Sequence, residues 1–457
     1  MSIRASYTEH CRAILRLGLP LIGGHVAQMA IGVTDTVMMG WYGVDGLAAV
    51  TLGSTYFFVF FIFGSGFAWA VMPMVASFNA EEDETGVRRA TRMGLWLSLG
   101  FGVLALPFMI WSEPILQMMG QGDSVARDAG LYLQIAAYGI LPALLVMAIK
   151  SYLAALERTQ IVLWITVLAA LCNALANYAL IFGNWGAPEM GIKGAAIASI
   201  VTQVVSLIGV VIYARFVLPE HAIFKRLWRA DPQMLAQVFK LGWPIGLTAL
   251  SEVGLFAASA VMMGWLGTIP LAAHGIAVQL AGLTFMVHLG LSNVATIRAG
   301  NAYGRHDPAH LERGALTVSV LSLVFAFFTI ALFLTVPEIF LSLFMQENEP
   351  RRDEILQVGV GLLAVAALFQ FVDGAQVIAL GLLRGLQDTK VPMILAAVSY
   401  WIVGIPCSYL FGFVLGMNGI GIWLGLVVGL ALAGVLLSLR FWGVSLPRLK
   451  AGEAIPA

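Results

Sequence analysis

The chain has 457 residues, of which 60% are hydrophobic and 11% charged, and its formal net charge is zero. Soluble domains carry charges on about 25% of their residues, so this composition excludes a soluble protein and indicates a membrane protein. The absence of a basic excess argues against a nucleic acid partner. Cys11, Cys172 and Cys407 have no CxxC spacing. We therefore expect apolar packing residues there rather than a disulfide or metal framework.

Apolar runs long enough to cross the hydrocarbon layer recur along the whole sequence, and they predict twelve transmembrane helices. The spans lie near residues 14–40, 47–75, 92–112, 129–150, 160–182, 193–214, 237–264, 272–297, 314–337, 355–380, 391–413 and 419–440. The first run follows Arg4, Arg12 and Arg16, as a signal sequence would. However, it continues to about Gly40 without a small-residue cleavage site, so we predict a retained first helix.

The distribution of Lys and Arg predicts the orientation of the chain. Of the 25 Lys and Arg residues, only Arg127, Lys193, Arg351 and Arg352 fall on one side of the predicted spans, and all others fall on the opposite side. Positively charged loops stay in the cytoplasm. We therefore predict a multi-pass protein of the bacterial inner membrane with both termini in the cytoplasm.

Three patterns of the first half recur in the second half at one offset of 224 residues. They are Leu17-Gly18-x-Pro20 with Leu241-Gly242-x-Pro244, Val37-Met38-Met39-Gly40-Trp41-x-Gly43 with Val261-Met262-Met263-Gly264-Trp265-x-Gly267, and Leu47-Ala48-Ala49 with Leu271-Ala272-Ala273. Six helices followed by six helices, both sets starting on the same side, form a parallel repeat. The predicted fold is an all-α membrane protein of two pseudo-symmetric six-helix lobes, an architecture that suits alternating-access transport.

The lobe boundaries follow from the polar stretches. We predict an N-terminal lobe at residues 1–215, a cytoplasmic linker at 216–236, a C-terminal lobe at 237–440 and a cytoplasmic tail at 441–457. Asp231-Pro232 within the linker has the pattern of an N-cap and a first helical residue.

Three acids remain at membrane depth once the span ends are set aside: Asp35, Glu252 and Asp373. Each should cost on the order of 3 kcal/mol at mid-membrane. Away from the span ends, the predicted spans that carry them contain no Lys or Arg as a partner. We therefore expect these acids to bind a proton, a sodium ion or a cationic solute.

Neutral oxygen-bearing residues could complete such a site. Asn173 and Asn177 are four residues apart, so they share one helix face. Thr202 adds a hydroxyl from the next span, and Thr34 and Thr36 flank Asp35. Interhelical hydrogen bonding is the alternative explanation of the Asn pair. For His25, His274 and His288 we favour that explanation, and Gly421, Gly425 and Gly429 form a small-residue stripe that lets two helices approach closely.

The sequence resembles the multidrug and toxic compound extrusion (MATE) transporters. The resemblance rests on Leu17-Gly18-x-Pro20 followed by Asp35 within Thr34-Asp35-Thr36-Val37-Met38-Met39-Gly40, on Ile297-Arg298-x-Gly300-x-x-x-Gly304, and on Leu383-Arg384-Gly385-x-x-Asp388-Thr389-x-x-Pro392. The resemblance extends from about residue 8 to residue 440. Glu252 and Asp373 resemble the two acids that the bacterial NorM-type branch carries on helices seven and ten.

The resemblance implies an antiporter that expels cationic, partly apolar compounds in exchange for sodium ions or protons. It implies coupling-cation sites at Asp35, Asn173, Asn177, Thr202, Glu252 and Asp373, with the three acids as ligands if the ion is sodium. Two positions depart from the family pattern: Asn177 stands where some relatives have aspartate, and Phe369 where some have tyrosine. Because of both departures, the resemblance does not decide whether the coupling ion is sodium or a proton.

Two other functions are compatible with a polytopic membrane protein. A flippase for lipid-linked sugars, the related two-lobed class, should have a basic cavity to hold pyrophosphate, but no Arg or Lys is evident at membrane depth. A membrane-embedded enzyme should show a catalytic motif, but the sequence has no HExxH and no GxxxxGK[ST], and Phe63 precedes Gly64-Ser65-Gly66 where a rhomboid-like motif needs glycine. We therefore expect a monomeric transporter of small organic cations that has no cofactor and no enzymatic activity.

Overall fold

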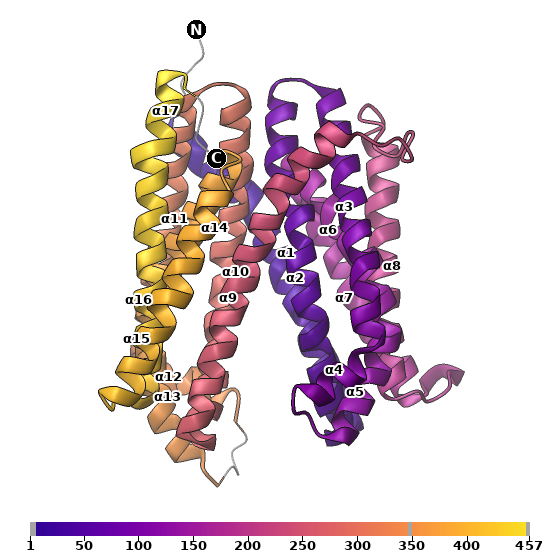
Figure 1. Cartoon of the computed structure of the whole chain (residues 1–457), viewed down its shortest axis with the longest axis vertical. Helices are drawn as coiled ribbons and strands as arrows, with labels where there is room; N and C mark the ends of the chain where they lie inside the picture. The colour runs from indigo at the N-terminus through magenta and orange to yellow at the C-terminus, as the bar shows by residue number, and fades with distance from the viewer. Residues whose placement is uncertain (1–5, 346–349, 454–457) are drawn as a thin grey trace. The chain divides into compact units, whose positions relative to one another are not determined.

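The structure is a computed structural model that describes residues 6–345 and 350–453. Arg4 and residues 454–457 of the predicted tail lie outside the described residues. All elements of the described part are helical (Figure 1).

The first half of the chain is built of eight α-helices with two short 3₁₀ turns between them. They are α1 (Tyr7–Tyr42), α2 (Val44–Ala80), α3 (Glu84–Ile110), α4 (Ser112–Met118), α5 (Asp123–Ala136), η1 (Ala137–Gly139), α6 (Ile140–Ala155), α7 (Thr159–Phe182), η2 (Asn184–Gly186) and α8 (Ile192–Val217).

The described part of the second half contains nine α-helices and three π-helical segments. They are α9 (Pro232–Leu266), α10 (Thr268–Gly304), α11 (Pro308–Thr335), α12 (Pro337–Ser342), α13 (Arg352–Gly385), α14 (Lys390–Ala397), the π-segment η3 (Val398–Gly404), α15 (Ile405–Tyr409), the π-segment η4 (Leu410–Val414), α16 (Asn418–Arg440), the π-segment η5 (Phe441–Ser445) and α17 (Leu446–Ala451).

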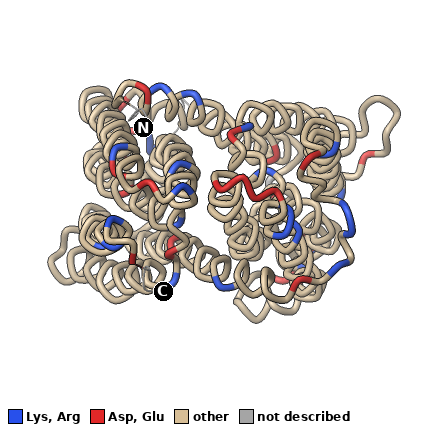
Figure 2. The backbone as a smooth tube through the Cα atoms, turned by 90° about the horizontal axis from the view of Figure 1, so that it is seen from above, with Lys and Arg blue, Asp and Glu red and all other residues tan. Residues whose placement is uncertain are grey.

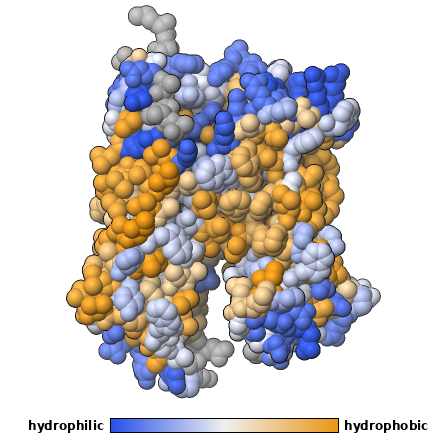
Figure 3. All heavy atoms as spheres, in the orientation of Figure 1, coloured by the Kyte–Doolittle hydropathy of each residue, from blue (hydrophilic) through white to orange (hydrophobic). Residues whose placement is uncertain are grey.

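Twelve helical stretches of the described chain are long and apolar enough to cross a membrane. This confirms the predicted spans, several of which extend further than their apolar runs. In each half apolar side chains form a band with hydrophilic residues at both ends (Figure 3). Residues 441–451, which we predicted as a tail, instead continue the last helix to Ala451. Phe441 and Leu446 are buried there, and this packing explains why the helix does not end at Arg440.

The helices pack into two compact units, each seen as a bundle in the end-on view (Figure 2). Unit 1 contains Met1–Ile22 and Leu247–Ala457, and unit 2 contains Gly23–Gly246. The predicted lobes keep α1 whole and assign α9 to the C-terminal lobe from residue 237 onward, whereas the units divide both helices after their prolines. The divisions fall two residues after Pro20 and Pro244, the matched prolines of the repeat. A proline inside a helix removes one backbone hydrogen bond, so each helix is weakest near the point of division.

The glycine stripe of α16 lies against the helix that contains η3, α15 and η4. A Cβ atom at Gly421 would overlap the backbone of Phe411, one at Gly425 would overlap the backbone of Ser408, and one at Gly429 would meet the Cα atom of Gly404. The predicted close approach of two helices is therefore confirmed. This packing holds η3, which carries a residue of the site described below, against α16.

Replacing Gly425 with alanine should destabilise the protein by about 3 kcal/mol, because its methyl group would meet backbone atoms that cannot move aside. Gly282→Ala is the matched control, since a Cβ atom there meets nothing within 4 Å. Thermal unfolding of the purified full-length variants in detergent measures both effects. Equal midpoints for the two variants would contradict the packing described here.

Asp231 joins the start of α9 to α3 within unit 2. Its Oδ1 accepts a hydrogen bond from the backbone N–H of Met234 at 3.1 Å, as expected for the predicted N-cap. Both carboxylate oxygens also accept from the guanidinium of Arg89. The hydrogen bond from Arg89 holds the pKa of Asp231 below its usual value.

The Arg89–Asp231 pair predicts a pH-dependent contribution to stability. A carboxylate with a lowered folded-state pKa stabilises the fold above its unfolded-state pKa of about 4, and this contribution is lost as the pH falls through the folded-state value. Arg89→Gln should therefore lower the free energy of unfolding by about 0.5 kcal/mol at neutral pH and by less under acid conditions. Arg158→Gln, an exposed arginine before α7, is the control. If Arg89→Gln lowers the free energy of unfolding by the same amount down to pH 3, the lost stability does not come from the charged Asp231 carboxylate.

Candidate cation sites

Asp35 is the centre of a polar cluster in unit 2. Asn173 Nδ2 donates to Asp35 Oδ1 at 3.0 Å, and Asn177 Nδ2 donates to the same oxygen at 2.6 Å. The two asparagines also contact each other, with Asn177 Nδ2 at 3.2 Å from Asn173 Oδ1. Their spacing of four residues on α7 places both amides opposite α1, as the sequence predicted.

This cluster has unused capacity to bind a cation. The amide oxygen of Asn177 is buried and has no hydrogen-bond partner, and among the described residues no donor reaches Asp35 Oδ2. Asp35 itself is half-buried. Carboxylate and amide oxygens with free lone pairs accept either a proton or a hard cation.

The three threonines contribute less than predicted. The hydroxyl of buried Thr202 donates to Ala198 O at 2.8 Å, and Thr34 and Thr36 donate to backbone oxygens one turn earlier on α1. None of these hydrogen bonds reaches Asp35. Instead, buried Tyr132 on α5 lies within electrostatic range of Asp35.

Glu252 and Asp373 form a second cluster in unit 1, joined by Gln376. Gln376 Nε2 donates to Glu252 Oε1 at 3.1 Å and lies 3.4 Å from Asp373 Oδ1. The hydroxyl of Tyr400 donates to the other end of the same amide, Gln376 Oε1, at 2.6 Å. Gln376 and Tyr400 are fully buried, and Asp373 is 2% exposed. The sequence indicated the two acids but neither Gln376 nor Tyr400.

The expectation that the acids have no basic residue in their own spans was wrong for the span of Asp373. Helix α13 continues to Gly385 instead of ending near residue 380, so Arg384 lies within it. Arg384 interacts electrostatically with Glu252 and Tyr400, although no ion pair within 4.0 Å joins Arg384 to an acid of the described residues. In unit 2, Lys150 also lies inside a span, where its Nζ donates to Thr166 Oγ1 at 2.8 Å.

Aromatic and histidine side chains also pack between the helices of unit 1. Phe369 is buried, and its ring centroid lies 5.7 Å from that of Phe256 and 5.4 Å from that of Trp423. Trp423 in turn donates to His274 Nδ1 at 3.1 Å, and His288 Nδ1 lies 2.8 Å from Ser322 Oγ. His274 and His288 therefore make the interhelical hydrogen bonds that we favoured for them.

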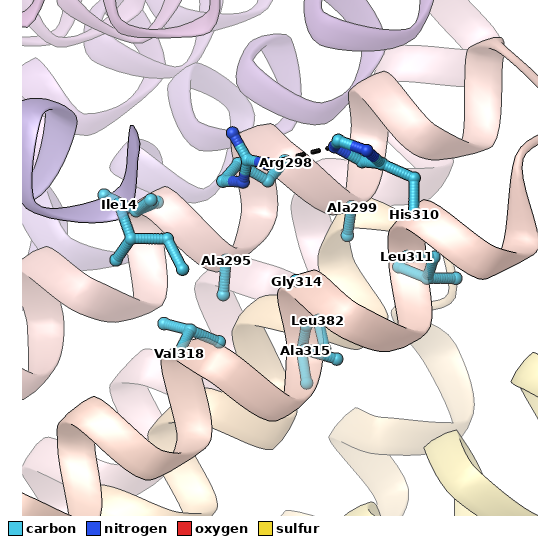
Figure 4. Close-up of a pocket in the computed structure, with 11 residues that line it drawn as sticks. Ile14, Ala295, Arg298, Ala299, His310, Leu311, Gly314, Ala315, Val318 and Leu382 are labelled. Carbon is cyan, nitrogen blue, oxygen red and sulfur yellow. Dashed lines mark hydrogen bonds between the residues drawn. The ribbon is translucent and has the colours of Figure 1, made fainter. Parts of the chain in front are cut away.

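A further polar cluster joins the first half of α1 to α10 and α11 in unit 1. Arg298 Nη2 lies 2.9 Å from His10 Nδ1 and 3.0 Å from His310 Nε2. In Figure 4, Arg298 points toward His310 above a small pocket with apolar walls that include Ile14 and Leu311. The pocket has a volume of about 10 Å³ and holds no more than about one water molecule, so it cannot bind a drug-sized solute.

A larger cavity of about 250 Å³ lies between α11, α13 and the last helix, but none of the three acids lines it. Within the part of the chain that the structure describes, no three His, Cys, Asp or Glu residues come together as a metal site. A sodium ion bound in either unit would therefore need neutral oxygen ligands in addition to carboxylates.

Comparison with known proteins decides the family. The model of the MatE family matches residues 20–179 and 244–410. The chain belongs to the MATE family. It is 43% identical over 438 residues to the "Probable multidrug resistance protein NorM" of Agrobacterium fabrum, covering 95% of this chain and 94% of that protein. It is also 43% identical over 454 residues to the protein of the same name from Rhizobium meliloti, covering 98% and 96%.

A solved MATE structure, in complex with MaL6, has the same fold with a TM-score of 0.88 at 20% identity, and the match covers 98% of both chains. The predicted twelve-helix MATE fold is therefore confirmed, and so is the prediction of a transporter family rather than an enzyme. The roles of the six predicted site residues stay predictions.

The amide cluster of unit 2 can be tested by a double-mutant cycle. Asp35→Leu and Asn177→Leu should show a coupling free energy of about 1 kcal/mol, because each removes one end of the same hydrogen bond. Asp35→Leu with Asn184→Ala is the control pair, since Asn184 donates to Tyr178 O away from Asp35. Unfolding of the purified variants in detergent measures both cycles. Additive effects of the first pair would show that the Asp35–Asn177 hydrogen bond is absent.

Proposed function

We propose that the chain is a multidrug efflux transporter of the bacterial inner membrane, which exports organic cations with apolar surfaces in exchange for entering sodium ions or protons. The observation that carries this proposal is the pairing of acids with amides inside the spans. Among the described residues, only neutral groups donate to Asp35 in unit 2, and Gln376 is the hydrogen-bond donor to both Glu252 and Asp373 in unit 1. Amides stabilise a carboxylate without neutralising it, so the negative charge remains available to a cation.

The mechanism follows from competition for these carboxylates. A proton or sodium ion that binds an acid removes its attraction for a cationic substrate, and the substrate is released. During alternating access, the protein then shifts between arrangements that bind the substrate and the coupling cation with different affinities. Aromatic side chains such as Phe256 and Trp423 suit a cationic, partly apolar solute. The relatives from Agrobacterium and Rhizobium are named as probable multidrug resistance proteins, and this supports drugs as substrates.

A lipid-linked sugar flippase is the alternative. Lys150 and Arg384 lie inside spans, so the absence of intramembrane cations no longer argues against it. What opposes it is the surroundings of these two residues. Lys150 is hydrogen-bonded to the neutral hydroxyl of Thr166. Arg384 interacts with Glu252, and the negative charge of Glu252 reduces the attraction of Arg384 for a phosphate.

Neutralising the acids should uncouple transport. Asp35→Asn and Glu252→Gln should each lower cation-driven efflux at least about tenfold, because each removes a charge that binds the coupling cation. Ethidium efflux from proteoliposomes, with sodium and pH gradients imposed separately, measures this loss and identifies the ion. Asp45→Asn and Glu338→Gln make the same substitutions at the start of α2 and α12 and should leave efflux unchanged.

Two results would contradict the proposal. Normal coupled efflux in either acid variant would remove that residue from the coupling role. Unchanged tolerance to ethidium and fluoroquinolones in a pump-deleted bacterial host, with the protein inserted in the membrane, would remove the multidrug function. Protein level in the membrane fraction distinguishes both results from failed insertion.

A further inference from the structure

Gln376 occupies the space between the two acids of unit 1. Its amide nitrogen is 3.1 Å from Glu252 Oε1 and 3.4 Å from Asp373 Oδ1, and its side chain is fully buried. An N–H donor placed between two carboxylates stands where a cation shared by both would bind. A cation that bridges these acids must therefore displace the amide nitrogen from at least one of them.

Tyr400 fixes which end of the amide faces the acids. Its hydroxyl donates to Gln376 Oε1 at 2.6 Å, and this leaves the nitrogen end for the carboxylates. Turning the amide over would point its oxygen at Glu252 and Asp373, which is unfavourable until a positive charge lies between them. With a cation bound, the same oxygen would be a suitable ligand.

The location of Tyr400 supports a specific role. It is fully buried and lies in η3, a π-helical segment of seven residues. Segments of this kind are rare and occur frequently at functional sites. The charged and titratable groups around the amide are Glu252 on α9, Asp373 and Arg384 on α13, and Tyr400 itself.

Unit 2 offers a comparison within the same chain. There the amide oxygen of Asn177 has no hydrogen-bond partner, so no hydroxyl fixes the orientation of that amide. The lock on the amide is thus a feature of the Glu252–Asp373 site and not a general property of acids in this fold.

We propose that Gln376 and Tyr400 are positioning residues of this site: Tyr400 locks the Gln376 amide with its N–H between Glu252 and Asp373, where the amide competes with the coupling cation. The inference rests on the proposed function, since it assigns a regulator to the same cation site. The lock weakens cation binding and so favours release of the cation after each cycle.

The test uses the full-length protein reconstituted in proteoliposomes. Tyr400→Phe retains the ring but removes the hydroxyl, and the half-saturating concentration of the driving cation should fall about fivefold with little change in the maximal efflux rate. Gln376→Met removes both ends of the amide at similar volume and should act in the same direction. Tyr152→Phe is the matched control, because it removes a buried hydroxyl that contacts His221 Nδ1 at 2.6 Å, away from the acids.

The double variant separates positioning from general structural damage. If Tyr400 acts through the amide, Tyr400→Phe should change nothing further in a Gln376→Met background. An unchanged or increased half-saturating concentration in Tyr400→Phe would overturn the proposal, as would an equal shift in both backgrounds. If Tyr400→Phe does not fold, as judged by gel filtration, Gln376→Met carries the same prediction on its own.

Equilibrium binding distinguishes failure of this inference from failure of the proposed function. Binding of radioactive sodium and proton uptake on acidification are measured on the same variants in detergent. If no gradient drives efflux in the unmodified protein, the proposed function is wrong. Tighter cation binding by Tyr400→Phe would still support the lock, and unchanged binding would refute it.

Discussion

A carboxylate inside a membrane protein needs groups that stabilise its charge, and the rest of this structure depends on that constraint. The chain meets it in two ways. Near the span ends the acids pair with arginine: Asp388 accepts from Arg440 Nε at 2.6 Å, and Asp231 accepts from Arg89. Burial raises the pKa of Asp388 despite this partner. Inside the spans the donors are amides: Asn173 and Asn177 for Asp35, and Gln376 for the acids of unit 1. An arginine pair makes an acid structural, whereas an amide leaves its charge available for exchange.

The helices that carry two of these acids each belong to both compact units. The first half of α1 packs in unit 1 and Asp35 lies on the part in unit 2, whereas the first half of α9 packs in unit 2 and Glu252 lies on the part in unit 1. The matched prolines, Pro20 and Pro244, lie between the two parts in both cases. The missing hydrogen bond of each proline thus lies N-terminal to the carboxylate that the helix carries within its span. Both halves share this order of proline and carboxylate, although the two carboxylates do not occupy matched positions of the repeat.

How much the sequence could predict depends on the range of the interaction. Hydropathy predicted all twelve spans, because the cost of polar groups in lipid is a local property. The Asn173–Asn177 pair was predictable from helical spacing. Gln376 and Tyr400 were not, because their hydrogen bond joins residues 24 positions apart and depends on packing around a π-segment. Arg384 was misplaced because a helix can extend beyond its apolar run. The hydroxyl of Thr202 was assigned to the site, but its own helix backbone offers an acceptor one turn away.

The repeat shows that the two acid clusters are not copies of each other. At the offset of 224 residues, Asp35 corresponds to Ser259 and Glu252 corresponds to Gln28. Ser259 donates to the backbone oxygen of Phe256 within its own helix. One cluster has a single acid with two amides, and the other has two acids that share one amide fixed by a phenol. Under the proposed function, a second carboxylate strengthens cation binding and a locked donor weakens it, so different contributions set the affinity of the two clusters for a cation. The duplicated scaffold was therefore conserved for its helices and prolines, while the chemistry at membrane depth diverged.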